Sequence, residues 1–166
     1  LTIKENDLIV ATQGRSFWVL DDLSVVQQKA VTILDENLHV FSVNDAYRFE
    51  GYQNLNAKNA GMNPPNGSVL NYFIKNYTDS SKVSIEILDG AKKQIKLFAT
   101  DAKEKKEKIE VNKGINQFVW DMYYPTANKI DGQILWHGTV GGPKAAPGNY
   151  FYKINKTFVD IRDFIP

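Results

Sequence analysis

Cysteine is absent from this 166-residue chain, and histidine and arginine are scarce. Without cysteine the chain cannot form disulfides, thiolate nucleophiles or zinc–thiolate sites. The two histidines, His39 and His137, are far apart in sequence and have no metal-ligand spacing. No Gly-x-Ser-x-Gly, phosphate-loop or dinucleotide motif is present either. The sequence therefore predicts no metal site and no cofactor.

A large charge of one sign and long apolar runs are also missing. The 20 basic and 19 acidic residues leave a formal net charge of +1, so we expect no nucleic-acid partner. No stretch is long and apolar enough to span a bilayer. Residues 1–4 have neither the basic nor the apolar region of a signal peptide, and no initiator Met. We therefore expect a fragment of a longer protein, with any targeting signal upstream.

The residues that are present favour β-structure. Apolar types make up 43% of the chain and aromatics 12%, which argues against disorder. The apolar residues are mostly Val, Ile, Phe, Tyr and Trp, which suit a pleated, half-buried surface. The composition thus predicts an all-β fold.

The first part of the chain predicts a hairpin that something else must cover. In residues 7–22 two short, nearly continuous apolar runs flank a turn at residues 13–16, where Gly14 can take a positive φ. Such runs are typical of strands that are covered on both faces, and a lone hairpin is marginal in water. A short helix at 24–28, with Ser24 as N-cap, and a strand at 38–41 follow. The Asn-rich stretch 47–65 reads as a connector, so we place domains at 1–60 and 61–166.

The second part alternates strands and turns. Val83, Ile85 and Ile87 share one face of a strand, and Asp89-Gly90 after them predicts a hairpin. Short strands with turn signals at this spacing indicate a sandwich or a barrel. The other predicted strands cover residues 69–74, 94–99, 109–111, 114–121 and 149–154. In the strand at 94–99, Ile95, Leu97 and Ala99 share a face, and Ile115, Phe118 and Trp120 are the large apolar residues of the strand at 114–121.

These segments resemble a known family. Residues 7–23 resemble the last-blade signature of bacterial sortilin-like β-propeller proteins, with Gln13 where that family usually has His. Arg15, Trp18, Asp21 and Asp22 stand where its pattern puts them. Residues 63–68, 83–90, 114–121 and 146–150 are similar to the immunoglobulin-like C-terminal module of the same proteins. The tail 156–166 does not fit that pattern.

The resemblance implies an architecture and a location. It predicts closing strands of a β-propeller followed by an immunoglobulin- or fibronectin-like antiparallel β-sandwich. It also implies a secreted protein, extracellular or periplasmic, whose partner is the remainder of the propeller. The family members are often labelled BNR-repeat proteins or glycosyl hydrolases, so an active site in the missing blades is implied as an alternative.

The polar candidates have structural alternatives. Arg15 suits a carboxylate of a sialic acid, but a sialidase needs several converging arginines, and the chain has only Arg15, Arg48 and Arg162. Adjacent Asp21 and Asp22 point to opposite faces of a strand, so they cannot act jointly on one bond. We expect them to cap the following turn or to pair with Arg15.

An aromatic group offers the second candidate site. Trp136 and His137, with Tyr123 and Tyr124, form a candidate platform for sugar rings; the alternative is that they cap the core. Three functions remain: a non-catalytic structural or interaction module, which we favour, a carbohydrate-binding module, and part of a glycosyl hydrolase. Exposed, coplanar aromatics would distinguish the second from the first.

Overall fold

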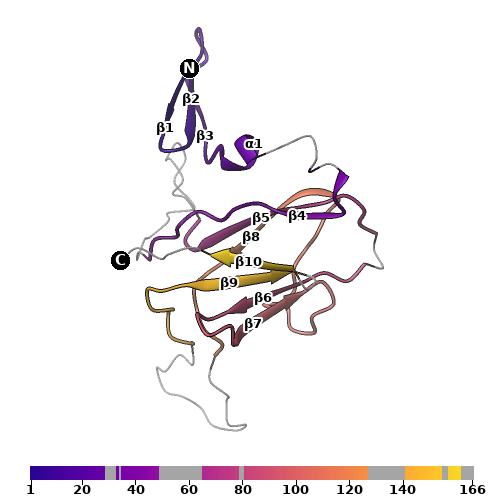
Figure 1. The fold of residues 1–166 in the computed structure, drawn as a ribbon. Coiled ribbons are helices and arrows are strands. Elements are labelled where there is room, and N and C mark those ends of the chain that lie inside the picture. Colours follow the sequence, from indigo (N-terminus) through magenta and orange to yellow (C-terminus); the bar gives the residue numbers. More distant parts are fainter. Residues whose placement is uncertain are drawn as a thin grey trace.

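In a computed structural model of the chain, residues 1–28, 33, 35–48, 65–78, 81–126, 141–154 and 157–161 are described. The fold is all-β, as the composition predicts, and its strands form three small antiparallel sheets (Figure 1). The elements in chain order are β1 Thr2–Lys4, β2 Asp7–Ala11, β3 Phe17–Leu20, α1 Ser24–Gln28, β4 Leu38–Val40, β5 Ser68–Ile74, β6 Ser84–Leu88, β7 Gln94–Ala99, β8 Gly114–Trp120, β9 Tyr150–Ile154 and β10 Thr157–Ile161. Within the described residues no helix is long and apolar enough to cross a membrane.

The first sheet, here called the N-terminal sheet, has the order β1-β2-β3. The predicted turn joins β2 to β3, with Gly14 at φ 78° and Ser16 at φ 65°. The backbone N–H of Thr12 donates to the Ser16 carbonyl at 3.2 Å and closes the turn. β1 was not predicted, because three residues are too few for their alternation to stand out.

The other two sheets, of order β4-β5-β8 and β10-β9-β6-β7, form what we call the body. One hydrophobic core receives side chains from both sheets. Phe118 of β8 has its ring centroid 4.9 Å from that of Phe98 in β7 and 6.2 Å from that of Tyr152 in β9. The core consists of Ala46, Leu70, Tyr72, Ile74, Val83, Ile85, Ile87, Phe98, Ile109, Val111, Phe118, Trp120, Met122, Ala145, Tyr150, Tyr152 and Ile154.

Period-two alternation explains which residues enter this core. In β9 the buried residues are Tyr150, Tyr152 and Ile154, with partly exposed residues between them. β5 alternates in the same way from Ser68 to Ile74. The Tyr152 hydroxyl donates to the buried Ser68 carbonyl at 3.1 Å, so this large polar group enters the core without losing its hydrogen bond.

Two strands show which of their apolar residues enter the core, and one predicted strand differs from the expectation. Ile115 is 54% exposed, because its odd position places it on the outer face, opposite Phe118 and Trp120. In β7 the residue that enters the core is Phe98, whereas Leu97 on the other face is exposed. The strand predicted at 109–111 is reduced to a bridge between Lys108 and Ala99, although Ile109 and Val111 are buried.

The C-terminal tail also contributes a strand. β10 pairs with β9 along its whole length and forms an edge of the four-stranded sheet. This strand begins inside the tail that does not fit the family pattern. In the three-stranded sheet of the body, β4 is an edge strand that pairs with β5, so residues before position 60 complete that sheet. The connector at 49–64 lies outside the described residues.

Candidate functional site

Apolar side chains occupy both faces of the N-terminal sheet. The strand register aligns Ile3, Leu8 and Leu20 across one face, and Ile9 and Val19 across the other. Farther along the hairpin, Val10 and Trp18 belong to the first of these faces, and Ala11 and Phe17 to the second. A sheet that is apolar on both sides is typical of a sheet buried between two layers.

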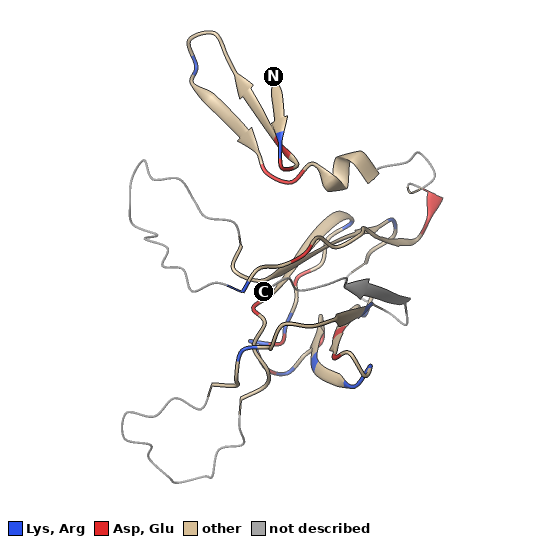
Figure 2. Ribbon diagram, turned by 60° about the vertical axis from the view of Figure 1, so that its left-hand side comes forward, with Lys and Arg blue, Asp and Glu red and all other residues tan. Residues whose placement is uncertain are grey.

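Neither face is covered by the part of the chain that the structure describes. In β3 the exposed fractions are 75% for Phe17, 64% for Trp18, 56% for Val19 and 52% for Leu20. No residue of β1–β3 belongs to the core of the body. Figure 1 shows the sheet projecting from the body, and Figure 2 shows its strands almost without charge, with acidic residues at the end nearest α1. Contiguous apolar exposure of this kind marks an interaction surface.

A few polar contacts join the N-terminal sheet to the body. The backbone N–H of Leu23 donates to the Asn6 carbonyl at 2.7 Å and ties α1 to the base of the sheet. The Asn44 amide donates to both carboxylate oxygens of Asp22 at 3.2 Å, and the Gln28 side chain accepts from the backbone N–H of Ser42 at 2.7 Å. These contacts hold the base of the sheet and leave both faces open.

Of the predicted binding residues, Arg15 and Trp18 lie together on the β2–β3 hairpin. The indole N–H of Trp18 donates to the Arg15 carbonyl at 3.0 Å. Arg48 lies on another segment, where it donates to the Ala145 carbonyl at 3.5 Å, and Arg162 is outside the described residues. The described arginines therefore do not converge on one carboxylate, as sialic-acid hydrolysis would require.

Asp22 has the capping role expected of the Asp21–Asp22 pair. Its carboxylate accepts the backbone N–H of Ser24 at 3.0 Å, at the start of α1, so Asp22 caps the helix that Ser24 was expected to cap. The Asp22 backbone has φ 53°, and its N–H donates to the Asp7 carboxylate at 3.0 Å. The predicted pairing with Arg15 is not among the ion pairs of the described residues.

Tyr123 and Tyr124 are the residues of the aromatic platform that the structure describes, and their rings do not both have an open face. Tyr123 is 44% exposed, and the Lys144 ammonium lies 5.8 Å from its ring centroid. Tyr124 packs against the core. Burial, followed by the hydrogen bond with Tyr124, raises the pKa of Tyr150 to about 12. Trp136 and His137 lie outside the described residues, so the platform as a whole stays a prediction.

An acidic cleft of about 480 Å³ lies between the base of the N-terminal sheet and the outer face of β5 and β8. Its carboxylates are those of Glu5, Asp7, Asp21, Asp22 and Asp45. Those of Asp7 and Asp22 accept backbone hydrogen bonds. Across the described residues, no three acidic or histidine side chains are grouped so as to hold a metal ion.

Leu20 belongs to the apolar hairpin that the sequence predicts to need a cover, and it is exposed in the N-terminal sheet. Ile3, which is also exposed there, was not predicted, because the short strand β1 gives no pattern of its own. Comparison with protein-family models, with curated proteins and with solved structures gave no match. The residues of the chain itself therefore carry the functional conclusion.

Proposed function

We propose that the chain is a non-catalytic structural and interaction module of an exported protein, whose N-terminal sheet packs against the remainder of a β-propeller. One observation carries this proposal: β1–β3 are apolar on both faces, and the described part of the chain covers neither. A propeller supplies the matching environment, because a blade has neighbours on both faces. The body, which has its own hydrophobic core, then supports the propeller from one side.

Energetics favour such docking. Fully burying one large apolar side chain contributes about 1.5–3 kcal/mol, and β3 alone offers Phe17, Trp18, Val19 and Leu20. Association of separate molecules costs about 4–15 kcal/mol, and a covalent link lowers that cost. Several buried side chains on two faces are thus enough to hold the sheet in place.

Two contacts in the body support an immunoglobulin-like module. The Tyr150 hydroxyl, at the start of β9, donates to the Ala146 carbonyl four residues upstream at 2.8 Å. This resembles the tyrosine corner of immunoglobulin-like sandwiches. Trp120 is fully buried, with its ring centroid 5.3 Å from that of Tyr150. A buried Trp at the centre of two facing sheets is a further feature of that fold.

The acidic residues support a role without catalysis. Asp22 is engaged with Ser24 and Asn44, and the Asp121 carboxylate accepts the backbone N–H of Tyr123 at 3.1 Å. We expect no turnover of fluorogenic glycosides by this chain. Turnover that disappears in Asp21→Asn or Asp121→Asn would contradict this part of the proposal.

Amide hydrogen exchange in the longer natural protein tests the docking. We expect the amides of Phe17–Leu20 to be strongly protected there and to lose protection in Val19→Asp, because a buried carboxylate disrupts the packed face. Ile115→Asp is the matched control, since Ile115 is similarly exposed but lies on β8 of the body. Unprotected β2 and β3 amides in the longer protein, or an upstream sequence without propeller strands, would overturn the proposal.

A further inference from the structure

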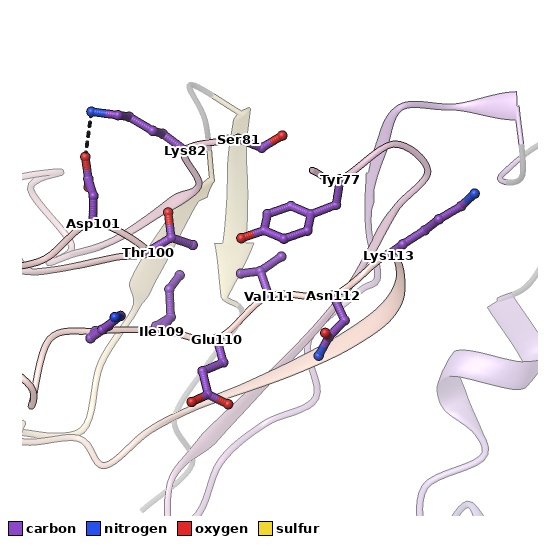
Figure 3. Close-up of a pocket in the computed structure, with 11 residues that line it drawn as sticks. Tyr77, Ser81, Lys82, Thr100, Asp101, Ile109, Glu110, Val111, Asn112 and Lys113 are labelled. Carbon is purple, nitrogen blue, oxygen red and sulfur yellow. Dashed lines mark ion pairs between the residues drawn. The ribbon is translucent and has the colours of Figure 1, made fainter. Parts of the chain in front are cut away.

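A second cavity, of about 610 Å³, lies on the body and contains none of the candidate binding residues discussed above. It is bounded by the chain that leaves β5, by the turn after β7 and by the extended segment that precedes β8 (Figure 3). The residues that line it include Tyr77, Thr100, Ile109, Val111 and Asn112. The volume lies within the range of about 300–1,000 Å³ that is usual for small-ligand sites.

Hydrogen bonds fix two of the three walls. The Thr100 N–H donates to the Val83 carbonyl at 3.0 Å, and the Val83 N–H donates to the Thr100 hydroxyl at 3.3 Å. On the opposite wall, the side-chain amide of buried Asn116 both accepts from and donates to the backbone of Asn112 at 2.7 Å. A site with fixed walls loses little conformational entropy when a ligand binds.

The lining combines one aromatic ring with neutral polar groups and charged groups. Figure 3 shows the Tyr77 ring between Ser81 and Thr100 on one side and the Ile109–Asn112 segment on the other. Tyr77 also packs against the core, which restrains its ring. The hydroxyls of Tyr77 and Thr100 line a cavity whose apolar part is formed by Ile109 and Val111. The Ser81 hydroxyl is already hydrogen-bonded with that of Thr78 at 3.0 Å.

Charge in the cavity is nearly balanced. Lys82 and Asp101 form an ion pair of 2.8 Å, and the hydrogen bond from Lys82 lowers the pKa of the Asp101 carboxyl. Lys108, Glu110 and Lys113 complete the charged groups of the lining. A site of this kind has little attraction for a polyanion and too much polar surface for an apolar ligand.

We propose that this cavity binds one or two rings of a neutral carbohydrate. The apolar face of a sugar ring packs on Tyr77, while the sugar hydroxyls exchange hydrogen bonds with the hydroxyls of Tyr77 and Thr100 and with the side chain of Asn112. Sugar hydroxyls both donate and accept, which matches hydroxyl and amide partners. The site is separate from the N-terminal sheet, so this proposal does not depend on the docking described above.

Amide chemical-shift titration of the full chain tests it, with cellobiose, maltose, N,N′-diacetylchitobiose and digalacturonic acid as probes. We expect at least one neutral disaccharide to shift the amides of Tyr77, Thr100 and Val111. Tyr77→Ala should weaken that binding about tenfold, equivalent to about 1.4 kcal/mol. Asn112→Ala, at an exposed position that carries little of the fold, should weaken it several-fold.

Tyr123→Ala is the matched control, because Tyr123 belongs to the aromatic platform predicted from sequence and does not line this cavity. The affinity of the Tyr123→Ala variant for the disaccharide should equal that of the unmodified chain. If no neutral disaccharide causes shifts, if only digalacturonic acid does, or if the shifts gather at Trp18 or Tyr123, the proposal is overturned. Unchanged binding in Asn112→Ala and Tyr77→Phe together would also overturn it.

Discussion

The N-terminal sheet and the body are built from the same kinds of residue but differ in how those residues alternate. Strands of the body, such as β5 and β9, place buried and partly exposed residues in turn, so each sheet has one core face. β3 is apolar at all four positions and exposed at all four. Alternation of buried and partly exposed residues thus accompanies strands that the chain covers by itself. The continuous apolar run of β3 accompanies a strand that the described part of the chain leaves uncovered.

The largest expected effect comes from removing a central side chain of the body. Trp120→Ala should lower the free energy of unfolding by about 3–5 kcal/mol, because the indole is fully buried. The matched variant in the N-terminal sheet, Trp18→Ala, should change it by no more than about 0.5 kcal/mol, since Trp18 is mostly exposed. Urea denaturation of both variants measures the difference. Equal losses of stability in the two variants would show that Trp18 is packed as tightly as Trp120.

High pH should have the next largest effect on the free energy of unfolding, through three tyrosines of the body. Burial raises the pKa of Tyr72 and of Tyr150 to about 12, and it also raises the pKa of Tyr152. An unfolded chain releases these protons near pH 10, the ordinary pKa of tyrosine. The stability they contribute is therefore fully present below about pH 10 and is lost as pH rises towards about 12.

Denaturant melts at successive pH values, with phenolate absorbance followed in parallel, check this prediction. We expect phenolate absorbance from the core tyrosines to rise together with unfolding. Ionisation of all eight tyrosines near pH 10 in the folded protein would show that these side chains are open to solvent.

A single hydrogen bond of the core gives a smaller effect. Tyr152→Phe removes the donor to the buried Ser68 carbonyl and should cost about 1–2 kcal/mol of stability. Tyr47→Phe is the control, because Tyr47 is exposed and its hydroxyl remains accessible to water. Thermal unfolding of the two variants separates them; a Tyr152→Phe protein as stable as the control would mean that the carbonyl finds another partner.

The smallest effect is expected from Phe17→Ser in the N-terminal sheet. In the isolated chain this change should alter the stability of the body by less than about 0.5 kcal/mol, because Phe17 is 75% exposed and does not belong to the core of the body. It should also reduce self-association at high protein concentration, since the exposed apolar surface shrinks. Sedimentation velocity measures that reduction, and a marked loss of stability of the body would contradict the account.

Much of the fold could be predicted from local pattern. The turn at Gly14, the helix from Ser24 to Gln28 and the alternation of β6 and β9 follow from residue type and spacing. The loop after Asp89 forms the expected hairpin, although it is longer than Asp-Gly alone suggests and places its positive φ, of 61°, at Lys92. Local chemistry thus gives the existence of a turn more reliably than its details.

The rest depends on contacts between distant segments, which one sequence does not reveal. β1 and β10 are strands because β2 and β9 offer them partners. Phe98 enters the core because β7 pairs with β6 in a register that aligns it with Ile85. The cavity at Tyr77 joins segments more than thirty residues apart, and none of them carries a recognisable motif.

Amide hydrogen exchange of this chain alone, in dilute solution, compares the local stability of the N-terminal sheet with that of the body. We expect the amides of β2 and β3 to exchange orders of magnitude faster than those of β5, β6, β8 and β9, because a sheet without covered faces opens locally while the body stays folded. Equal protection of both regions, lost together in one cooperative transition, would contradict the account. It would show that the N-terminal sheet is as complete by itself as the body is.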